Sequence, residues 1–175
     1  MPTPIGHAIA AVAAGWMVAH PARDRRALVI QVVAFGALGV APDLDLLINR
    51  HRGMSHSIGM AAIAATVVAL VQVPVAGTRA RIWLAAWAAW ATHALLDALA
   101  LDRAAPLGLM AFWPFSREYF QTGLEVFAPV SRAIRAPTFL PTAIIALTRE
   151  LLILAPIVYA VWRWRRPPSA APGTS

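Results

Sequence analysis

The chain contains no cysteine and no lysine, and only 13% of its residues are charged. The absence of cysteine excludes disulfide bonds and thiolate metal sites, so any metal ion must be bound by histidine, aspartate or glutamate. Because lysine is absent, the formal net charge of +7 comes entirely from arginine. The arginines lie in short clusters between apolar runs, which is typical of the ends of membrane segments and not of a nucleic-acid-binding surface. We therefore expect membrane lipids as partners and no nucleic acid.

Hydrophobic residues make up 59% of the 175 residues, well above their usual share in a soluble domain. Prolines, glycines and arginines divide the sequence into five apolar segments, at residues 5–20, 27–41, 58–73, 82–101 and 141–162. This pattern predicts an all-α integral membrane bundle of about five helices. Two segments are short against the roughly 20 residues that a spanning helix needs, so a partly embedded hairpin of the first two helices is an alternative.

Residues 102–140, between the fourth and fifth segments, are rich in proline and aromatic residues. We expect them to form interfacial loops and short amphipathic helices, not a further span. One domain is predicted over residues 1–166, followed by a disordered tail over residues 167–175. The oligomeric state is not indicated by the sequence.

Polar residues concentrate in residues 42–57, P-D-L-D-L-L-I-N-R-H-R-G-M-S-H-S. Four of them carry side chains that bind divalent cations: Asp43, Asp45, His51 and His56. The aspartates are also explained as turn formers and the histidines as ordinary loop residues. However, carboxylates at a helix C-terminus face the negative end of the helix dipole, and a nearby cation would reverse that penalty.

His93 and Asp97 lie four residues apart on the fourth expected helix and therefore on one face of it. Alone, this pair is more typical of a hydrogen bond between helices than of a metal site. If every segment crosses the membrane, all seven candidate ligands fall on one face of the bundle: His7, Asp43, Asp45, His51, His56, His93 and Asp97. This convergence predicts a site for divalent metal, with zinc as the expected ion. Seven donors suit two ions better than one.

The motifs P-D-L-D, H-R-G-M-S-H-S, T-H-A-L-L-D and W-P-F resemble the YdjM-like family of membrane-bound metal-dependent hydrolases, over residues 7–116. Ser55 stands where that family more often has threonine. The family is distantly similar to zinc-dependent phospholipases C and single-strand nucleases. That resemblance implies a set of direct metal ligands, with Asp97 bridging two ions: His7, Asp43, His56, His93 and Asp97. No histidine follows His93, which argues against the third metal site of those enzymes.

We therefore expect a metal-dependent hydrolase of phosphoester bonds, acting on a lipid or lipid-linked substrate. Asp45 or His51 is a candidate general base or an orienting residue for a ligand. Arg52 and Arg117 are candidates for phosphate binding, although both also fit ordinary membrane-surface arginines. The alternatives are a metal ion or proton transporter, or a non-catalytic membrane protein with a structural metal.

The distribution of arginine predicts the orientation in the membrane. Six arginines lie on the face of the candidate ligands: Arg50, Arg52, Arg103, Arg117, Arg132 and Arg135. Eight lie on the opposite face: Arg23, Arg25, Arg26, Arg79, Arg81, Arg163, Arg165 and Arg166. Positive residues favour the cytoplasmic side, so we expect an inner or plasma membrane protein with a cytoplasmic C-terminus and the site on the outer face.

Overall fold

The computed structural model describes residues 2–48, 52–71, 77–100, 107–130 and 135–166. These residues form five α-helices, two 3₁₀ helices and no strand, which confirms the all-α prediction. The α-helices are α1 (Pro4–Ala19), α2 (Arg25–Val40), α3 (Ile58–Val71), α4 (Arg79–Ala98) and α5 (Phe139–Arg165). The 3₁₀ helices η1 (Ala41–Ile48) and η2 (Met54–His56) lie between α2 and α3.

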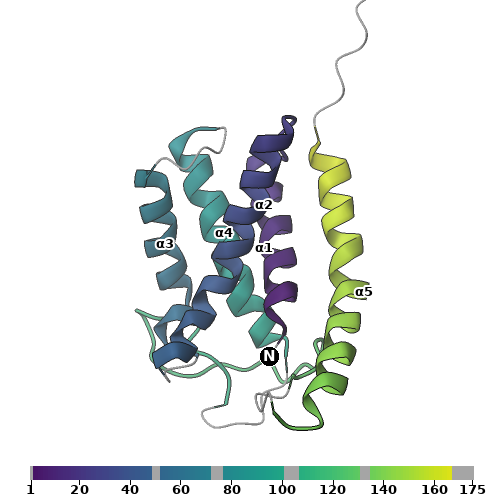
Figure 1. Ribbon diagram of the computed structural model, residues 1–175. Coiled ribbons are helices and arrows are strands. Elements are labelled where there is room, and N and C mark those ends of the chain that lie inside the picture. Colours follow the sequence, from purple (N-terminus) through teal and green to yellow (C-terminus); the bar gives the residue numbers. More distant parts are fainter. Residues whose placement is uncertain (1, 49–51, 72–76, 101–106, 131–134, 167–175) are drawn as a thin grey trace, which may run out of the picture.

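The helices run side by side in alternating directions, so the starts of α1, α3 and α5 lie at the same end as the ends of α2 and α4 (Figure 1). Three helices begin at residues whose side-chain oxygens accept a hydrogen bond from the first turn. These are Thr3 before α1, Asp24 before α2 and Thr78 before α4. Such capping satisfies backbone N–H groups that have no partner within the helix.

Helix α1 occupies the centre of the bundle and packs against α2, α4 and α5. Its contacts are made by small residues, since Ala11 on α1 and Ala85 and Ala89 on α4 are completely buried. Small side chains let helix backbones approach closely, which is how helices associate in a membrane. Among the α-helices, α5 packs only on α1, and α3 packs only on α4, in the parts of the chain that the structure describes.

Two segments are long and apolar enough to cross a membrane: Arg25–Leu47, with 23 residues, and Phe139–Arg165, with 27 residues. The first comprises α2 and most of η1, and it extends beyond the second apolar segment predicted from the sequence, residues 27–41. Helices α1 and α3 are apolar but shorter, with 16 and 14 residues. A bundle of five complete spans therefore remains a prediction.

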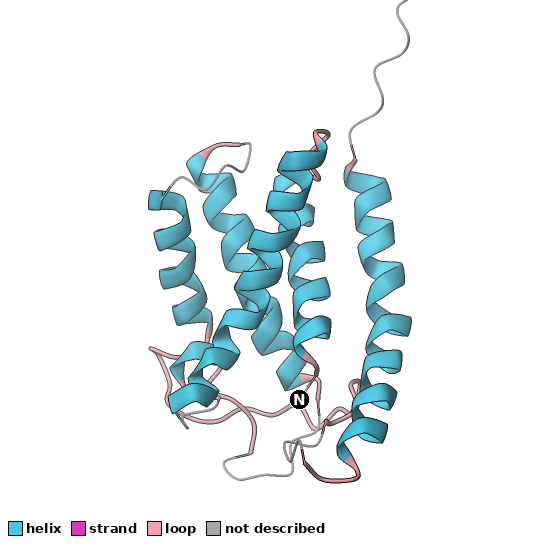
Figure 2. Cartoon of the chain, in the orientation of Figure 1, coloured by secondary structure: helices cyan, strands magenta, loops and turns pink. Residues whose placement is uncertain are grey.

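The connection between α4 and α5 forms loops at the end of the bundle where α1 begins (Figure 2). Its described residues, 107–130 and 135–138, contain turns and isolated bridges but no helix. The expected short amphipathic helices are therefore wrong for these residues. Several aromatic side chains of the loop are exposed, including Phe115 at 88% and Phe112 at 48%, as suits a segment at the membrane surface.

Candidate metal centre

Three imidazoles and two carboxylates meet at the end of the bundle where α1 begins and α4 ends. They come from α1, η1, η2 and α4, and are His7, Asp43, His56, His93 and Asp97. The three histidines are at most 1% exposed, Asp97 is 4% exposed, and the Asp43 side chain is 9% exposed. The structure thus brings together the five residues that the resemblance implied as direct metal ligands.

The carboxylate oxygens lie between the imidazole nitrogens. Asp43 Oδ1 is 3.5 Å from His93 Nε2 and 3.6 Å from His56 Nε2. Asp97 Oδ2 is 3.5 Å from His56 Nε2 and 3.7 Å from His93 Nε2, while its Oδ1 is 3.6 Å from His7 Nε2. The rings of His7 and His93 stack with their centroids 3.7 Å apart. Asp43 therefore faces two imidazoles and Asp97 faces three.

These spacings fit ligands of a shared cation. They exceed the usual 2.9–3.0 Å of an N–H···O hydrogen bond, whereas tetrahedral ligands about 2.0–2.2 Å from zinc lie about 3.3–3.6 Å apart. Within the described residues, both nitrogens of His7, Nε2 of His93 and both oxygens of Asp97 are buried and make no hydrogen bond. Leaving such atoms unsatisfied costs several kcal/mol, and a divalent cation would satisfy them. The cluster can therefore hold metal.

Helix α2 determines which nitrogen of His93 faces the cluster. His93 Nδ1 lies 2.6 Å from the backbone oxygen of Gly39, near the C-terminal end of α2. Because a carbonyl oxygen can only accept, Nδ1 carries the proton, and the lone pair of Nε2 points toward Asp43 and Asp97. The second hydrogen bond of a metal-binding histidine usually fixes the ring in this way.

Asp45 orients the ring of His56 in a similar way, because it contacts Nδ1 while Nε2 faces Asp43 and Asp97. Its Oδ2 lies 3.2 Å from His56 Nδ1, and it also accepts hydrogen bonds from Ser55 Oγ at 2.5 Å and Arg52 N at 3.1 Å. Burial lowers the pKa of His56, but hydrogen bonds with Asp43 and Asp45 outweigh this effect and raise the pKa to about 9. The negative charge that retains a proton here would equally attract a cation.

Tryptophans on α4 hold the His56 segment against the helix that carries His93. Trp90 Nε1 donates to the backbone oxygen of Ser55 at 2.9 Å, and Trp87 Nε1 donates to that of Ile58 at 3.3 Å. The motifs of the sequence do not include these tryptophans. Trp83, Trp87 and Trp90 are spaced by four and three residues, which places them on one face of α4. This spacing is the only feature of the sequence that indicates a shared role.

The position of His7 depends on α5. Glu150 of α5 is completely buried and accepts hydrogen bonds from the backbone nitrogen of Thr3 at 2.6 Å and from the Thr3 hydroxyl. Thr3 caps the start of α1, and its backbone oxygen accepts a hydrogen bond from His7 N at 3.1 Å. Glu150 thus anchors the helical turn that carries His7.

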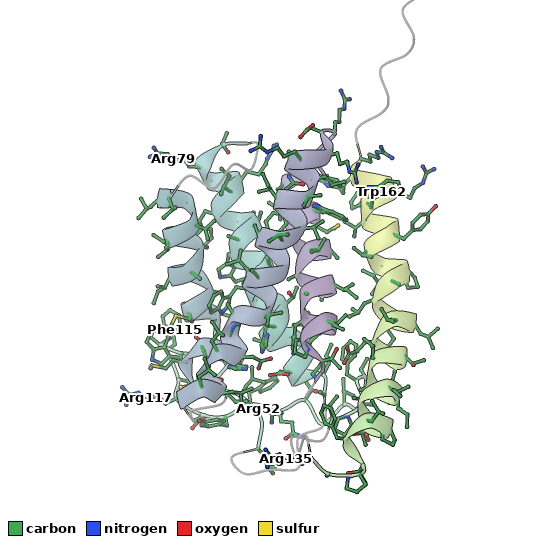
Figure 3. The ribbon with its side chains drawn as sticks, in the orientation of Figure 1. Arg52, Arg79, Phe115, Arg117, Arg135 and Trp162 are labelled. Atoms are coloured by element: carbon green, nitrogen blue, oxygen red, sulfur yellow. The ribbon has the colours of Figure 1, made fainter. Side chains whose placement is uncertain are left out.

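The other four candidate residues lie outside the cluster or outside the described residues. Asp45 is not one of the five clustered residues, and it contacts His56 through Nδ1, the ring nitrogen that does not face Asp43 and Asp97. His51 lies outside the described residues. Arg52 is buried to 4% exposure, has a positive φ of 67°, and is near enough to Asp97 for an electrostatic interaction. Arg117 is exposed at the edge of this end of the bundle (Figure 3).

Comparison with known proteins places the chain in one family. The family model described as YdjM inner membrane protein matches residues 1–168, nearly the whole chain. No curated protein and no solved structure matches the chain significantly. The matched residues include every described helix and all five residues of the candidate metal site. The chain therefore belongs to the YdjM inner membrane protein family.

Proposed function

We propose that the chain is a membrane-bound hydrolase that cleaves a phosphoester bond of a lipid or lipid-linked substrate with the help of divalent metal. The observation that carries the proposal is the buried cluster of three imidazoles and two carboxylates at one end of an apolar bundle. Buried ionisable groups in such surroundings are costly and typically serve a function. The hydrolysis would add water across a P–O bond, with hydroxide going to phosphorus and the proton to the leaving oxygen.

Two cations fit this donor set better than one. The two possible ligand groups share His93 and otherwise differ, one adding His7 and Asp43, the other His56 and Asp97. The two oxygens of Asp97 face different imidazoles, as expected of a bridging carboxylate. Bound divalent metal would make water nucleophilic at neutral pH and stabilise the charge on the phosphoryl oxygens. Zinc suits these ligands.

The residues around the cluster have separate tasks in this proposal. Asp45 and the Gly39 carbonyl keep the ligand nitrogens of His56 and His93 directed at the metal. Arg52 supplies a buried positive charge beside the cluster, which would bind a phosphate oxygen of the substrate. For Arg117, exposed at the same end, we expect at most a contact with lipid headgroups.

The position of the cluster favours a hydrolase over a transporter. A transporter binds its ion near the middle of the membrane, where the site can be reached from both sides. Here the ligands lie at helix ends on one side, and the exposed aromatic loop covers that side. From the arginine distribution we propose that this side faces outward and that the C-terminus is cytoplasmic.

Metal analysis and hydrolysis assays on purified protein test the proposal. We expect wild-type protein to bind divalent metal and to hydrolyse a phosphodiester, and His56→Ala and Asp97→Asn to lose both properties. His20→Ala is the matched control, because His20 contacts Arg165 at the opposite end of the bundle. Wild-type protein that binds no divalent metal would refute the proposal. Metal binding without turnover of any ester would instead indicate a structural metal.

A further inference from the structure

An apolar cavity lies between α2 and α3, on the side of the bundle. Its volume is about 280 Å³ and it is partly open to the surroundings. One wall is lined by Ala34 and Ala37 of α2 and by Ala41, the first residue of η1. Val68 of α3 lies opposite, and Ile82 of α4 contributes to the lining. All lining side chains are apolar, so the cavity suits hydrocarbon and not a polar ligand.

The cavity exists because α2 and α3 do not pack against each other in the described part of the chain, although both pack against α4. Its three alanines recur every three or four residues and therefore share one side of α2. The neighbouring surface is apolar as well, with Val33 65% exposed and Val67 55% exposed. In a membrane protein such a surface faces lipid, and lipid chains can enter the cavity from the side.

The cavity begins next to the metal cluster. Ala41 lines it at the C-terminal end of α2, two residues before Asp43. From Ala41 to Ala34 it follows α2 away from the cluster for about 10 Å, at 1.5 Å per residue. A membrane lipid has the same arrangement, because its phosphate lies at the surface and its hydrocarbon points toward the middle of the bilayer.

We propose that this cavity holds one hydrocarbon chain of the substrate while the phosphate of the same molecule lies at the metal cluster. The substrate is then a lipid phosphoester that enters sideways from the bilayer between α2 and α3. This inference rests on the proposed function and adds to it where the hydrocarbon chain of the substrate lies and by which route the substrate enters.

Ala37→Phe is the variant that tests the inference. Ala37 lines the cavity but is itself exposed, so a larger side chain fills the cavity without disturbing the helix contacts. Val32→Phe is the matched control, because Val32 is an exposed apolar residue of α2 outside the lining. Neither residue belongs to the metal cluster, so both variants should bind as much metal as wild type.

The first measurement compares two esters with the metal-loaded protein. One is bis(p-nitrophenyl) phosphate, which has no hydrocarbon chain, and the other is long-chain phosphatidylglycerol in vesicles. We expect Ala37→Phe to lower kcat/KM for the phospholipid by about tenfold or more, because the phenyl ring would occupy the space of the hydrocarbon chain and remove its apolar contacts. The soluble ester should be hydrolysed as by wild type. Equal kcat/KM of Ala37→Phe and wild type for the phospholipid would overturn the inference.

The second measurement does not depend on activity. Phosphatidylglycerol with a photoreactive group in its acyl chain should label residues 34–41 and α3 in wild type and in Val32→Phe, but about tenfold less in Ala37→Phe. Labelling confined to other surfaces, or crosslinks between the cavities of two copies, would overturn the inference. Lost labelling with unchanged phospholipid turnover would show a structural lipid and overturn the substrate assignment. If wild type hydrolyses neither ester, the hydrolase proposal fails, and labelling alone decides whether the cavity holds a chain.

Discussion

Replacing Gly39 by alanine tests whether the backbone of α2 positions the metal ligands. The Gly39 carbonyl holds His93 through a bond of 2.6 Å, and this glycine also lies where α2 crosses α1. A Cβ atom at residue 39 would be 2.6 Å from the backbone oxygen of His7 and in still closer contact with the Ala11 side chain. Backbone and a short alanine cannot give way, so α2 must move.

The size of the effect follows from these contacts. Carbon atoms pack at about 3.5–4.0 Å, so relief of the clash requires α2 and α1 to separate by about 1 Å. Overpacking of this kind costs about 1–3 kcal/mol. The separation also moves the Gly39 carbonyl away from His93 Nδ1, which weakens the hydrogen bond that orients the ring. Loss of such an orienting contact lowers metal affinity by about 10–100-fold.

Gly36→Ala is the matched control for this variant. It lies nearly one turn earlier on α2, and its Cβ would meet only the Ala8 side chain, at an ordinary 3.6 Å. In both variants the change from glycine to alanine stabilises the helix by the same amount, about 0.5–1 kcal/mol. We expect Gly36→Ala to match or exceed wild type in thermal stability in detergent and to bind metal normally, and Gly39→Ala to be weaker in both. Wild-type metal affinity and melting temperature in Gly39→Ala would refute the reasoning.

Three further predictions concern the cluster and its supports. Asp45→Asn should lower metal affinity by about 10–100-fold, because an amide holds the Nδ1 proton of His56 less well; an unchanged Kd in competition titrations would contradict this role. Trp90→Phe should lower the free energy of unfolding by about 1 kcal/mol through loss of its bond to Ser55, whereas Trp164→Phe, whose ring is 71% exposed, should leave the thermal midpoint unchanged. A chelator should lower the midpoint of wild type, since metal at 100 times its Kd adds about 2.7 kcal/mol; a midpoint unaffected by chelation argues against bound metal.

The cluster of histidines and aspartates was largely predictable because its residue types carry their own signal. Imidazoles and carboxylates are rare in an apolar chain, and alternation of helix direction was enough to bring His7, Asp43, His56, His93 and Asp97 to one end. The same reasoning could not separate Asp45 from the ligands. Asp43 and Asp45 have identical chemistry, and only the geometry of η1 directs one toward the cluster and the other to the far side of His56.

Other supports of the site leave little trace in the sequence. The Gly39 carbonyl that orients His93 is a backbone atom, which every residue has. The close approach at Gly39 depends on how α1 and α2 are rotated about their axes, and residue types do not determine that rotation. The cavity beside α2 arises because α2 and α3 do not pack against each other in the described residues. Patterns of apolar residues predict which segments are helical but not which helices remain apart.

The bond between Glu150 and Thr3 joins positions 147 residues apart in the chain. Helix α1 is made before α5, and among the α-helices of the described chain α5 packs only on α1. A growing chain can therefore assemble α1 to α4 while the turn that carries His7 still lacks its anchor. Assembly of the candidate ion-binding site is thus complete only when α5 has been made, and a copy that stops before position 150 would leave the turn that carries His7 without its Glu150 anchor.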